Sequence, residues 1–579
     1  MANIHLNNLI ERAENRFSID SKNMSMTDWI CENTTIHGKK FSVERYPFQR
    51  DILDDMHPNM DVKKCSQVGL TEGQIRKMLG FLVRNRGTKG IFTLPNEKLY
   101  DKISKTRIQP IVEKDKVFNP EGAGKVTRSK EVMQFGYSWL YVTGCTEADA
   151  TSTSADAVFN DEVDLSPQDM LALFNSRLQD SDWKIRQRFS TPTFPAFGID
   201  QGFQVSDQHL YLCKCDKCNH WNWPEFNRKF ITVPGLPDHI QEIVDIDHNI
   251  VDDIDILGAY VHCEKCRAPL DLSRLDNRQW VAKHPNRAHH RGYSVSPFTT
   301  ERLPPSYIIT QLLDYKKREY IRGFHNTVLA QTYSDNNIQI SREAIDRCMG
   351  YEQILDVSKS SNTWVGIDVG QTCHITLGAG SSAHDMSVFD FRTVHVDNLI
   401  RTVEEIMDQY RVVGGTIDRH PYEPTADAVF KASDGKILPA EYRGNKEVNL
   451  VNDATQTLTH VQIDRTMALD QVARQVKRGT ISFNGYKHQR SIITDHLRNM
   501  VRDEKPDEPA KWIKLDSNDH YFHSLANLLV APKVSDVVLL KSNHEIRTLV
   551  SSAVVSMPNQ QSQLLGRSNK RVDFPVLGM

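Results

Sequence analysis

Two pairs of cysteines stand in C-x-x-C spacing, Cys215 with Cys218 and Cys263 with Cys266. Each pair can close a tight turn and present two thiolates, and two pairs supply the four ligands of a tetrahedral Zn²⁺ site. Because 44 residues separate the pairs, we expect them to meet across an inserted β-rich loop. Four protein ligands leave no open position, so the predicted role of this zinc is structural. Three neighbours remain as alternative ligands: Cys213, His220 and His262.

A second group of residues has the types needed to bind a nucleotide. The segment 63–72, KKCSQVGLTE, precedes a helix-like run, GQIRKMLGFLV. A phosphate-binding loop needs exposed backbone N–H groups, a small residue close to the phosphate, and a hydroxyl for Mg²⁺. Gly69 and Thr71 fit the last two roles. The lysine that usually precedes the hydroxyl residue is absent, because Leu70 occupies that position.

The partner of such a loop is an apolar strand that ends in carboxylates. The run 155–160 is followed by Asp161 and Glu162. In this arrangement the aspartate supports Mg²⁺ and the glutamate orients the attacking water. The alternative is a surface loop with solvated acids. Downstream, the polar turn Ser190-Thr191-Pro192 makes Thr191 a candidate sensor of the γ-phosphate.

A third group of residues could cut a phosphodiester bond. Asp368 and Asp418 each end an apolar run, and Asp519 opens a helical segment whose first turn also carries His520 and His523. A two-metal nuclease needs carboxylates converging on two Mg²⁺ or Mn²⁺ ions, and an RNase H-like fold supplies them from these three kinds of element. Each aspartate alone could equally end a strand or cap a helix.

The elements that would position these groups indicate an α/β multidomain chain, since 579 residues are too many for one core. Strand-like runs at 91–95, 139–144 and 156–161 alternate with helical segments. We therefore predict a P-loop ATPase domain with a zinc-ribbon-like insert, followed by an RNase H-like nuclease domain. The expected divisions are 1–44 (a helical docking segment), 45–204 (ATPase core), 205–295 (zinc insert), 296–358 (helical lid or linker), 359–537 (nuclease) and 538–579 (a tail with a docking peptide).

Composition narrows the class of protein further. The chain is 39% apolar and 25% charged, with a net charge of −3, as in ordinary globular proteins. We expect no membrane segment and no exported leader. Ten cysteines, four of them in pairs, suit a metal site in a reducing compartment better than disulfides. The net charge does not by itself indicate a nucleic-acid-binding protein, but a local basic groove could still hold DNA.

The motifs together resemble the large terminase subunits of lambda-like bacteriophages. The family pattern K-S-A-R-V-G-x-S/T overlays the residues from Lys64 to Thr71 without gaps, which implies that Lys64 is the phosphate-binding lysine. Tyr46 and Gln49 resemble the adenine-binding motif, one stacking on the base and the other bonding its edge. Gln67 replaces an arginine common in the family, which leaves four candidates for an arginine finger: Arg50, Arg76, Arg84 and Arg86.

Two further features bear on the resemblance. Trp280 and the strand-like Arg291–Ser294 follow the cysteine pairs as they do in the family. Many relatives have D-H-x-x-D at the last helix, and His523 stands where the second aspartate would be. We favour Asp519 as the metal ligand and keep His523 as the alternative, which would favour Mn²⁺.

The resemblance implies an ATP-driven motor that forms a ring on the portal of a procapsid and cuts concatemeric viral DNA. The implied partners are double-stranded DNA, the small terminase subunit, which we assign to the N-terminal helix, and the portal protein, assigned to the C-terminal peptide. The implied location is the bacterial host cytoplasm. Two other functions remain open: a helicase-like nuclease–ATPase unconnected with capsids, and a non-catalytic zinc-containing DNA-binding or assembly protein.

Overall fold

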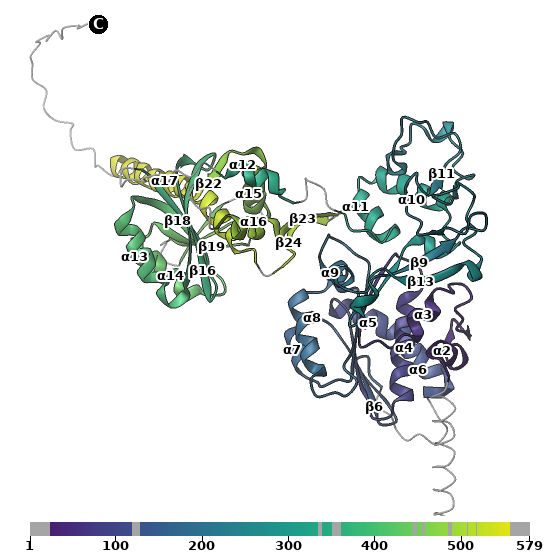
Figure 1. The fold of residues 1–579 in the computed structure, drawn as a ribbon. Helices are drawn as coiled ribbons and strands as arrows, with labels where there is room; N and C mark the ends of the chain where they lie inside the picture. The colour runs from purple at the N-terminus through teal and green to yellow at the C-terminus, as the bar shows by residue number, and fades with distance from the viewer. Residues whose placement is uncertain are drawn as a thin grey trace, which may run out of the picture. The chain divides into compact units, whose positions relative to one another are not determined.

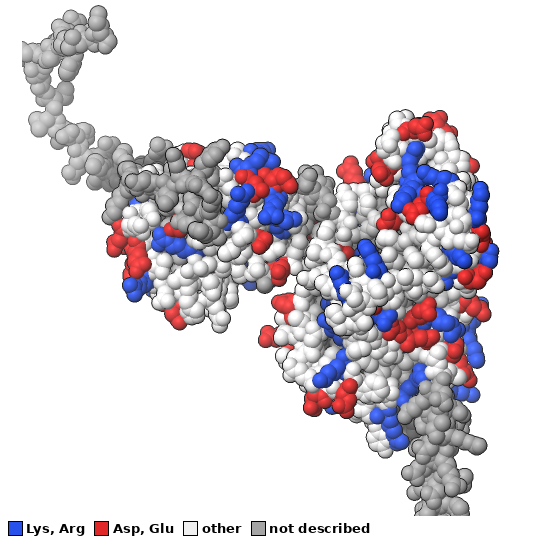
Figure 2. Space-filling model, viewed as in Figure 1, with Lys and Arg blue, Asp and Glu red and all other residues white. Residues whose placement is uncertain are grey.

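The computed structural model describes residues 24–118, 128–333, 339–349, 361–443, 448–453, 458–483, 489–505, 508–516 and 518–555, the last with side chains to 538. The chain forms two compact units, Met1–Asp335 with Lys505–Glu508, and Asn336–Glu504 with Pro509–Met579 (Figure 1). Figure 2 shows acidic and basic side chains interspersed over the visible face of each unit. Among the described residues, no helix is both long and apolar enough to span a membrane.

A ten-stranded sheet organises the first unit, in the order β10-β9-β14-β3-β8-β7-β4-β6-β5, with β13 also paired to β9. Neighbours from β9 to β6 run parallel, whereas β5, β10 and β13 pair antiparallel at the two edges. The strands are β3 (Asn59–Lys64), β4 (Lys89–Thr93), β5 (Val132–Phe135), β6 (Ser138–Thr143), β7 (Ala157–Asp161), β8 (Ile185–Ser190), β9 (His209–Lys214), β10 (Trp221–Asn222), β13 (Arg278–Ala282) and β14 (Arg291–Val295).

Helices cover both faces of this sheet, so its central strands are buried on both sides. In β7, Ala157 and Phe159 join a core with the long helix α4, whereas Val158 between them joins a second core with α8. Figure 1 shows α4 and α8 on opposite sides of the strands. The helices of this part are α2 (Met26–Asn33), α3 (Gln49–Asp54), α4 (Leu70–Arg84), α5 (Glu97–Ile103), α6 (Gln109–Lys114), α7 (Glu147–Thr151), α8 (Gln168–Asn175) and α9 (Gly198–Val205).

The region between β9 and β13 is an insert with little regular structure. It contains a two-stranded sheet of β11 (Ile231–Thr232) and β12 (Tyr260–Val261). Its apolar residues share one core with α10 (Pro305–Lys317) and with the π-helical turn Phe324–Val328 that follows α11 (Ile321–Gly323). The insert and the helical segment, which we expected as separate regions, therefore form one packed body.

An eight-stranded sheet organises the second unit, in the order β20-β21-β19-β18-β15-β16-β17-β22. Strands β15, β16 and β17 form an antiparallel meander, and β18 and β19 continue the sheet in parallel from β15. The strands are β15 (Thr363–Asp368), β16 (Thr372–Ser382), β17 (Asp385–His395), β18 (Val412–Asp418), β19 (Ile437–Glu441), β20 (Asn449–Asn452), β21 (Leu458–Gln462) and β22 (Ile481–Phe483), and β23 (Met500–Lys505) and β24 (Glu508–Lys514) form a separate pair.

The last helix sets the geometry of this unit. Its helices are α12 (Arg342–Cys348), α13 (Leu399–Gln409), α14 (Glu423–Ala432), α15 (Arg465–Arg478), α16 (Arg490–Arg498) and α17 (His520–Val555). Helix α17 packs across β15, β16 and β18. A Cβ at Gly366 would collide with the backbone of Ser524 and Leu528. The bare glycine thus lets α17 lie directly on β15, beside the strand end that carries Asp368.

The α/β multidomain architecture predicted from the sequence is confirmed. The detailed divisions differ in two places. Helix α12, expected within a linker, places Ile345 and Cys348 in the core of the second unit, and α17 continues to Val555 where we expected a tail. The part of the predicted N-terminal docking segment in 1–23 and the predicted docking peptide within 556–579 lie outside the described residues.

Candidate functional site

A tight loop joins β3 to α4 at the carboxyl edge of the sheet in the first unit. The strand ends at Lys64, and Gly69 precedes the helix with a φ of +72°, a conformation that disfavours side chains. Two backbone N–H groups of the loop are fixed from outside it: Cys65 donates to the Val295 carbonyl at 2.9 Å and Ser66 to the Thr327 carbonyl at 2.8 Å. The loop therefore has a defined path with the helix N-terminus at its end, as an anion site requires.

The charged residues of this edge converge on one point, because only β8 separates β3 from β7. Lys64 Nζ lies 3.0 Å from Glu162 Oε1 and 3.7 Å from Asp161 Oδ1. The hydroxyl of Thr71 donates to Asp161 Oδ2 at 2.8 Å. The structure thus brings together the four residues that sequence reasoning assigned to phosphate, metal and water.

Burial and neighbouring charges shift the pKa values of Lys64 and Asp161. Burial alone would lower the pKa of Lys64, but the carboxylates of Asp161 and Glu162 raise it above its usual value, so Lys64 carries a positive charge. Burial raises the pKa of Asp161. Its Oδ1 has no hydrogen-bond partner among the described residues. A buried carboxylate oxygen beside a threonine hydroxyl fits Mg²⁺, which binds through such oxygens together with phosphate oxygens.

The residues assigned to the adenine lie against the same loop. Tyr46 donates its hydroxyl to the Gln67 carbonyl at 3.2 Å, and the buried Gln49 donates its amide to the Val68 carbonyl at 2.5 Å. In this structure both side chains brace the loop. The four candidate arginines have partners of their own: Arg50 binds Asp28, Arg76 binds Glu72 and the Thr35 carbonyl, Arg84 binds the Met24 carbonyl, and Arg86 lies over the ring of Tyr137.

The turn that follows β8 is tied to the end of β7. Asp164, two residues beyond Glu162, accepts from the backbone N–H and the hydroxyl of Thr193, both at 2.7 Å. Its own N–H donates to the Ser190 hydroxyl at 3.1 Å. Thr191 lies half-buried between these anchored residues. A displacement of this turn would therefore shift Asp164 and, through it, the carboxylates at the end of β7.

A short segment closes this network into a ring. The buried Asn326 donates its amide to the carbonyls of Thr193 at 2.8 Å and Gln331 at 2.9 Å. Its neighbour Thr327 accepts from Ser66 of the loop after β3. Residues 324–331 thus hold the loop after β3 and the turn after β8 at the same time. Sequence reasoning missed Asn326, because a polar residue in a short helical segment carries no local signal.

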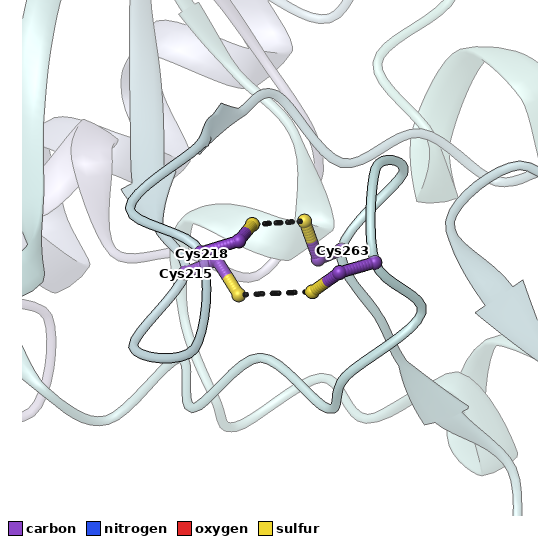
Figure 3. A group of neighbouring side chains, drawn as sticks. Cys215, Cys218 and Cys263 are labelled. Atoms are coloured by element: carbon purple, nitrogen blue, oxygen red, sulfur yellow. Dashed lines mark hydrogen bonds between the residues drawn. The ribbon is translucent and has the colours of Figure 1, made fainter.

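The four paired cysteines meet in the insert, and Figure 3 labels three of them, Cys215, Cys218 and Cys263. Their Sγ atoms all lie within 4.8 Å of one another, with Cys215 to Cys266 and Cys218 to Cys263 both at 3.6 Å. In a tetrahedral zinc–thiolate site with bonds of about 2.3 Å the sulfur atoms would be roughly 3.8 Å apart. The observed separations fit that geometry. Burial opposes ionisation of Cys263, but backbone N–H groups of Cys266 and Lys265 lower its pKa to about 6.

The alternative zinc ligands have other contacts. His220 Nε2 lies 2.7 Å from Glu264, and His262 contacts Arg267 and the Cys263 carbonyl through its two ring nitrogens. Cys213 Sγ faces the carbonyls of Lys214 and Asp271. The C-x-x-C spacing was therefore sufficient to identify the cluster, and all ten cysteines are free of disulfides.

In the second unit, Asp368 and Asp418 lie at the ends of adjacent parallel strands, since Ile367 is in register with Ile417. Burial raises the pKa of Asp418 well above its usual value, and the Asp368 carboxylate adds to this effect. Burial would also raise the pKa of Asp368, but the hydrogen bond from His520 holds it below its usual value. Asn527 of α17 donates to Asp418 Oδ1 at 2.9 Å. A buried carboxyl, Asp368, beside a half-buried one, Asp418, fits a divalent cation.

The first turn of α17 differs from the sequence expectation in which side chain it presents. His520 Nδ1 lies 2.9 Å from Asp368 Oδ2. Asp519 precedes the helix and lies 3.4 Å from His523 Nε2. The potential metal ligands that the described residues bring together here are Asp368, His520 and His374 of β16. Sequence reasoning missed His374, although it stands directly opposite Asp368 in the β15–β16 hairpin.

Comparison with known proteins gives the following likenesses. Residues 36–279 match the family model of the phage terminase large subunit gpA, ATPase domain, and no curated protein matches the chain. The large terminase of bacteriophage HK97 is 12% identical, covering 87% of this chain and 98% of that chain, with a TM-score of 0.49. The large terminase of a thermophilic bacteriophage is 11% identical, covering 85% and 98%, with a TM-score of 0.29. The large terminase nuclease of another thermophilic phage, G20c, is 12% identical, covering 32% and 94%, with a TM-score of 0.22. Structural likenesses of this degree assign no activity.

Proposed function

We propose that the whole chain is the large subunit of a phage terminase, since residues 36–279 match the ATPase domain of that family. It hydrolyses ATP to drive double-stranded viral DNA into a procapsid, and its second unit cuts concatemeric viral DNA. The observation that carries the ATPase is the convergence of Lys64, Thr71, Asp161 and Glu162 at one edge of a parallel sheet.

The roles of these residues follow from their positions. Lys64 binds the β- and γ-phosphates, and Thr71 and Asp161 hold Mg²⁺, which neutralises charge that develops on the phosphates. Because Lys64 is bonded to Glu162, it must exchange that carboxylate for phosphate when ATP binds. The exchange releases Glu162 to orient the attacking water. Thr191, on a turn bonded to Asp164 through Thr193, reports the presence of the γ-phosphate.

The second unit supplies the endonuclease in this proposal. Asp368 and Asp418 would hold Mg²⁺ or Mn²⁺, and such an ion would offset the repulsion of the neighbouring carboxylates. Asp519, with His523 as the alternative, remains the candidate for a third ligand from α17. The adjacent carboxyls at the ends of β15 and β18, one buried and one half-buried, support this assignment.

The cysteine cluster is proposed to hold one structural Zn²⁺. The near-tetrahedral spacing of its sulfur atoms supports this assignment. Since the cluster belongs to the core shared by the insert, α10 and the turn 324–328, zinc would stabilise the segment that contacts the phosphate loop.

The partners of such a motor are double-stranded DNA, the small terminase subunit and the portal, on which the chain forms a ring in the bacterial cytoplasm. DNA contacts are mainly to phosphate, because a packaging motor must ignore sequence. The N-terminal stripe is proposed to dock the small subunit and the C-terminal peptide to dock the portal.

The proposal is tested by assaying plasmid cleavage and ATP hydrolysis in the same preparations of the full chain. Asp368→Ala should abolish cleavage with Mn²⁺ or Mg²⁺ and leave ATP hydrolysis intact, and Lys64→Ala should do the reverse. Cleavage that persists in Asp368→Ala would refute the nuclease site. If the intact chain cuts no DNA, even with its partner subunits present, the nuclease assignment is refuted and only the ATPase assignment remains.

A further inference from the structure

Histidines surround Asp368 from three elements of the second unit. His374 lies opposite Asp368 on β16, His520 contacts it from α17, and His496 adds a third ring from α16. The ring centroids of His374 and His520 are 4.5 Å apart and those of His374 and His496 are 5.5 Å apart. Packing alone does not call for three imidazoles beside Asp368, because each buried polar ring must also find hydrogen-bond partners.

The ligand atoms of three of these side chains form a compact group. Asp368, His374 and His520 each offer one atom within 4.8 Å of the other two. Asp368 is 8% exposed and His374 is 7% exposed. His374 Nδ1 has no hydrogen-bond partner among the described residues. In contrast, His496 Nδ1 already accepts from the backbone N–H of Tyr521 at 3.1 Å, so His496 supports the group without belonging to it.

We propose that Asp368, His374 and His520 form a two-histidine, one-carboxylate site for a divalent transition metal such as Mn²⁺, Fe²⁺ or Co²⁺. The inference rests on the proposed nuclease, whose metal it selects. Imidazole suits Fe²⁺ and the later ions of the series, and Mn²⁺, although it also binds oxygen ligands well, accepts imidazole more readily than Mg²⁺, which binds oxygen ligands and dehydrates reluctantly. A cleavage site built around these residues therefore depends on a transition metal and works poorly with Mg²⁺.

The stacking of the two rings shows which one must move. His374 and His520 lie at 10° to each other, and a metal ion binds in the plane of an imidazole, so one ion cannot serve both rings as they stand. His374 is buried against α16 and α17. His520 has 39% of its side chain exposed. His374 is thus the fixed imidazole, and His520 turns from its bond with Asp368 to complete the site.

The test measures metal coordination separately from cleavage. Mn²⁺ is bound to the full chain without nucleotide, and its electron spin-echo spectrum is examined for modulation by directly bound ¹⁴N. We expect this modulation in the intact chain and a loss of at least tenfold in Mn²⁺ affinity in His374→Gln. His384→Gln, at the far end of the β16–β17 hairpin, is the matched control and should bind Mn²⁺ normally. His520→Gln, at a half-exposed position, provides a second variant if His374→Gln does not fold, as judged by circular dichroism and thermal unfolding.

The outcomes separate this inference from the proposed nuclease. Mn²⁺ bound without ¹⁴N modulation, with affinity unchanged in both histidine variants, would overturn the site. Cleavage equally fast with Mg²⁺ and Mn²⁺ and insensitive to His374→Gln would also overturn it and leave the nuclease standing. Nitrogen-coordinated Mn²⁺ in a chain that cuts no DNA with any metal would support the site and withdraw the nuclease.

Discussion

Replacing Thr71 by valine removes one hydroxyl from the proposed Mg²⁺ site and almost nothing else. The hydroxyl donates to Asp161 Oδ2 at 2.8 Å, and the other oxygen of that buried carboxyl has no hydrogen-bond partner among the described residues. Valine has nearly the same shape as threonine, so the change removes this hydrogen bond from Asp161 while the packing of α4 is kept.

The expected magnitude follows from that single contact. A hydrogen bond to a charged group contributes roughly 1.5–3 kcal/mol, and about 1.4 kcal/mol corresponds to a factor of ten. We therefore expect the Mg²⁺ concentration that gives half-maximal ATP hydrolysis to rise by roughly 10- to 150-fold in Thr71→Val. Thr71→Ser, which restores the hydroxyl, should recover most of the loss.

The assay is steady-state ATP hydrolysis by the full chain across a Mg²⁺ titration. Thr88→Val is the matched control, since the buried Thr88 donates its hydroxyl to the Asn85 carbonyl at 2.7 Å. Thr88 directly precedes β4, at the amino ends of the parallel strands, whereas Thr71 lies at their carboxyl ends. The reasoning is refuted if Thr71→Val has the Mg²⁺ dependence of the intact chain, or if Thr88→Val shifts it equally.

Three further predictions concern the surroundings of that site. Burial raises the pKa of Asp164 from 3.8 to about 7; the folded chain then holds this proton more tightly than the unfolded chain, so stability is lost as the pH rises from about 4 to about 7. The melting temperature should fall across that window relative to Asp164→Asn, and parallel curves would contradict this. Asn326→Asp replaces two donated hydrogen bonds by repulsion from the Thr193 and Gln331 carbonyls. It should lower the kcat of ATP hydrolysis roughly 5- to 100-fold with little change in KM. An unchanged kcat in steady-state assays would contradict a role for the hydrogen-bond network through Asn326 in hydrolysis. Cys263→Ser should reduce zinc from about one ion per chain to near zero by elemental analysis, whereas Cys213→Ser should keep its zinc.

Two strands that end at candidate site residues could be predicted from the sequence because each is a mostly apolar run that stops at a carboxylate. Asp161 and Asp368 were recognisable for this reason. Lys64 was not, since Leu70 occupies the usual lysine position directly before Thr71 and only the family resemblance pointed to Lys64. The path of a loop depends on what fixes it from outside, here the carbonyls of Val295 and Thr327.

The site proposed as the nuclease was harder to predict for a different reason. A shift of one residue in where a helix begins turns each of its side chains by about 100°. Helix α17 begins at His520, so Asp519 stands before the first turn and pairs with His523. His374 could have been found by counting across the hairpin. The sequence could not show that α12 belongs to the second unit. An apolar stripe indicates that a helix packs on a core, but it does not identify which core.

The position of the cysteine pairs between two paired strands has a consequence for how the chain folds. Strand β9 pairs with β13 from Cys213 to Arg278, 65 residues apart in the chain. A metal bridge between Cys215 and Cys266 would shorten the loop that must close to roughly 14 residues. The entropy of closing a loop grows with the logarithm of its length, so the bridge saves about 1.4 kcal/mol, or about a factor of ten in the chance of encounter. Bound early, the metal would act as a template for one edge of the ten-stranded sheet, and refolding from denaturant should be faster with zinc than without it.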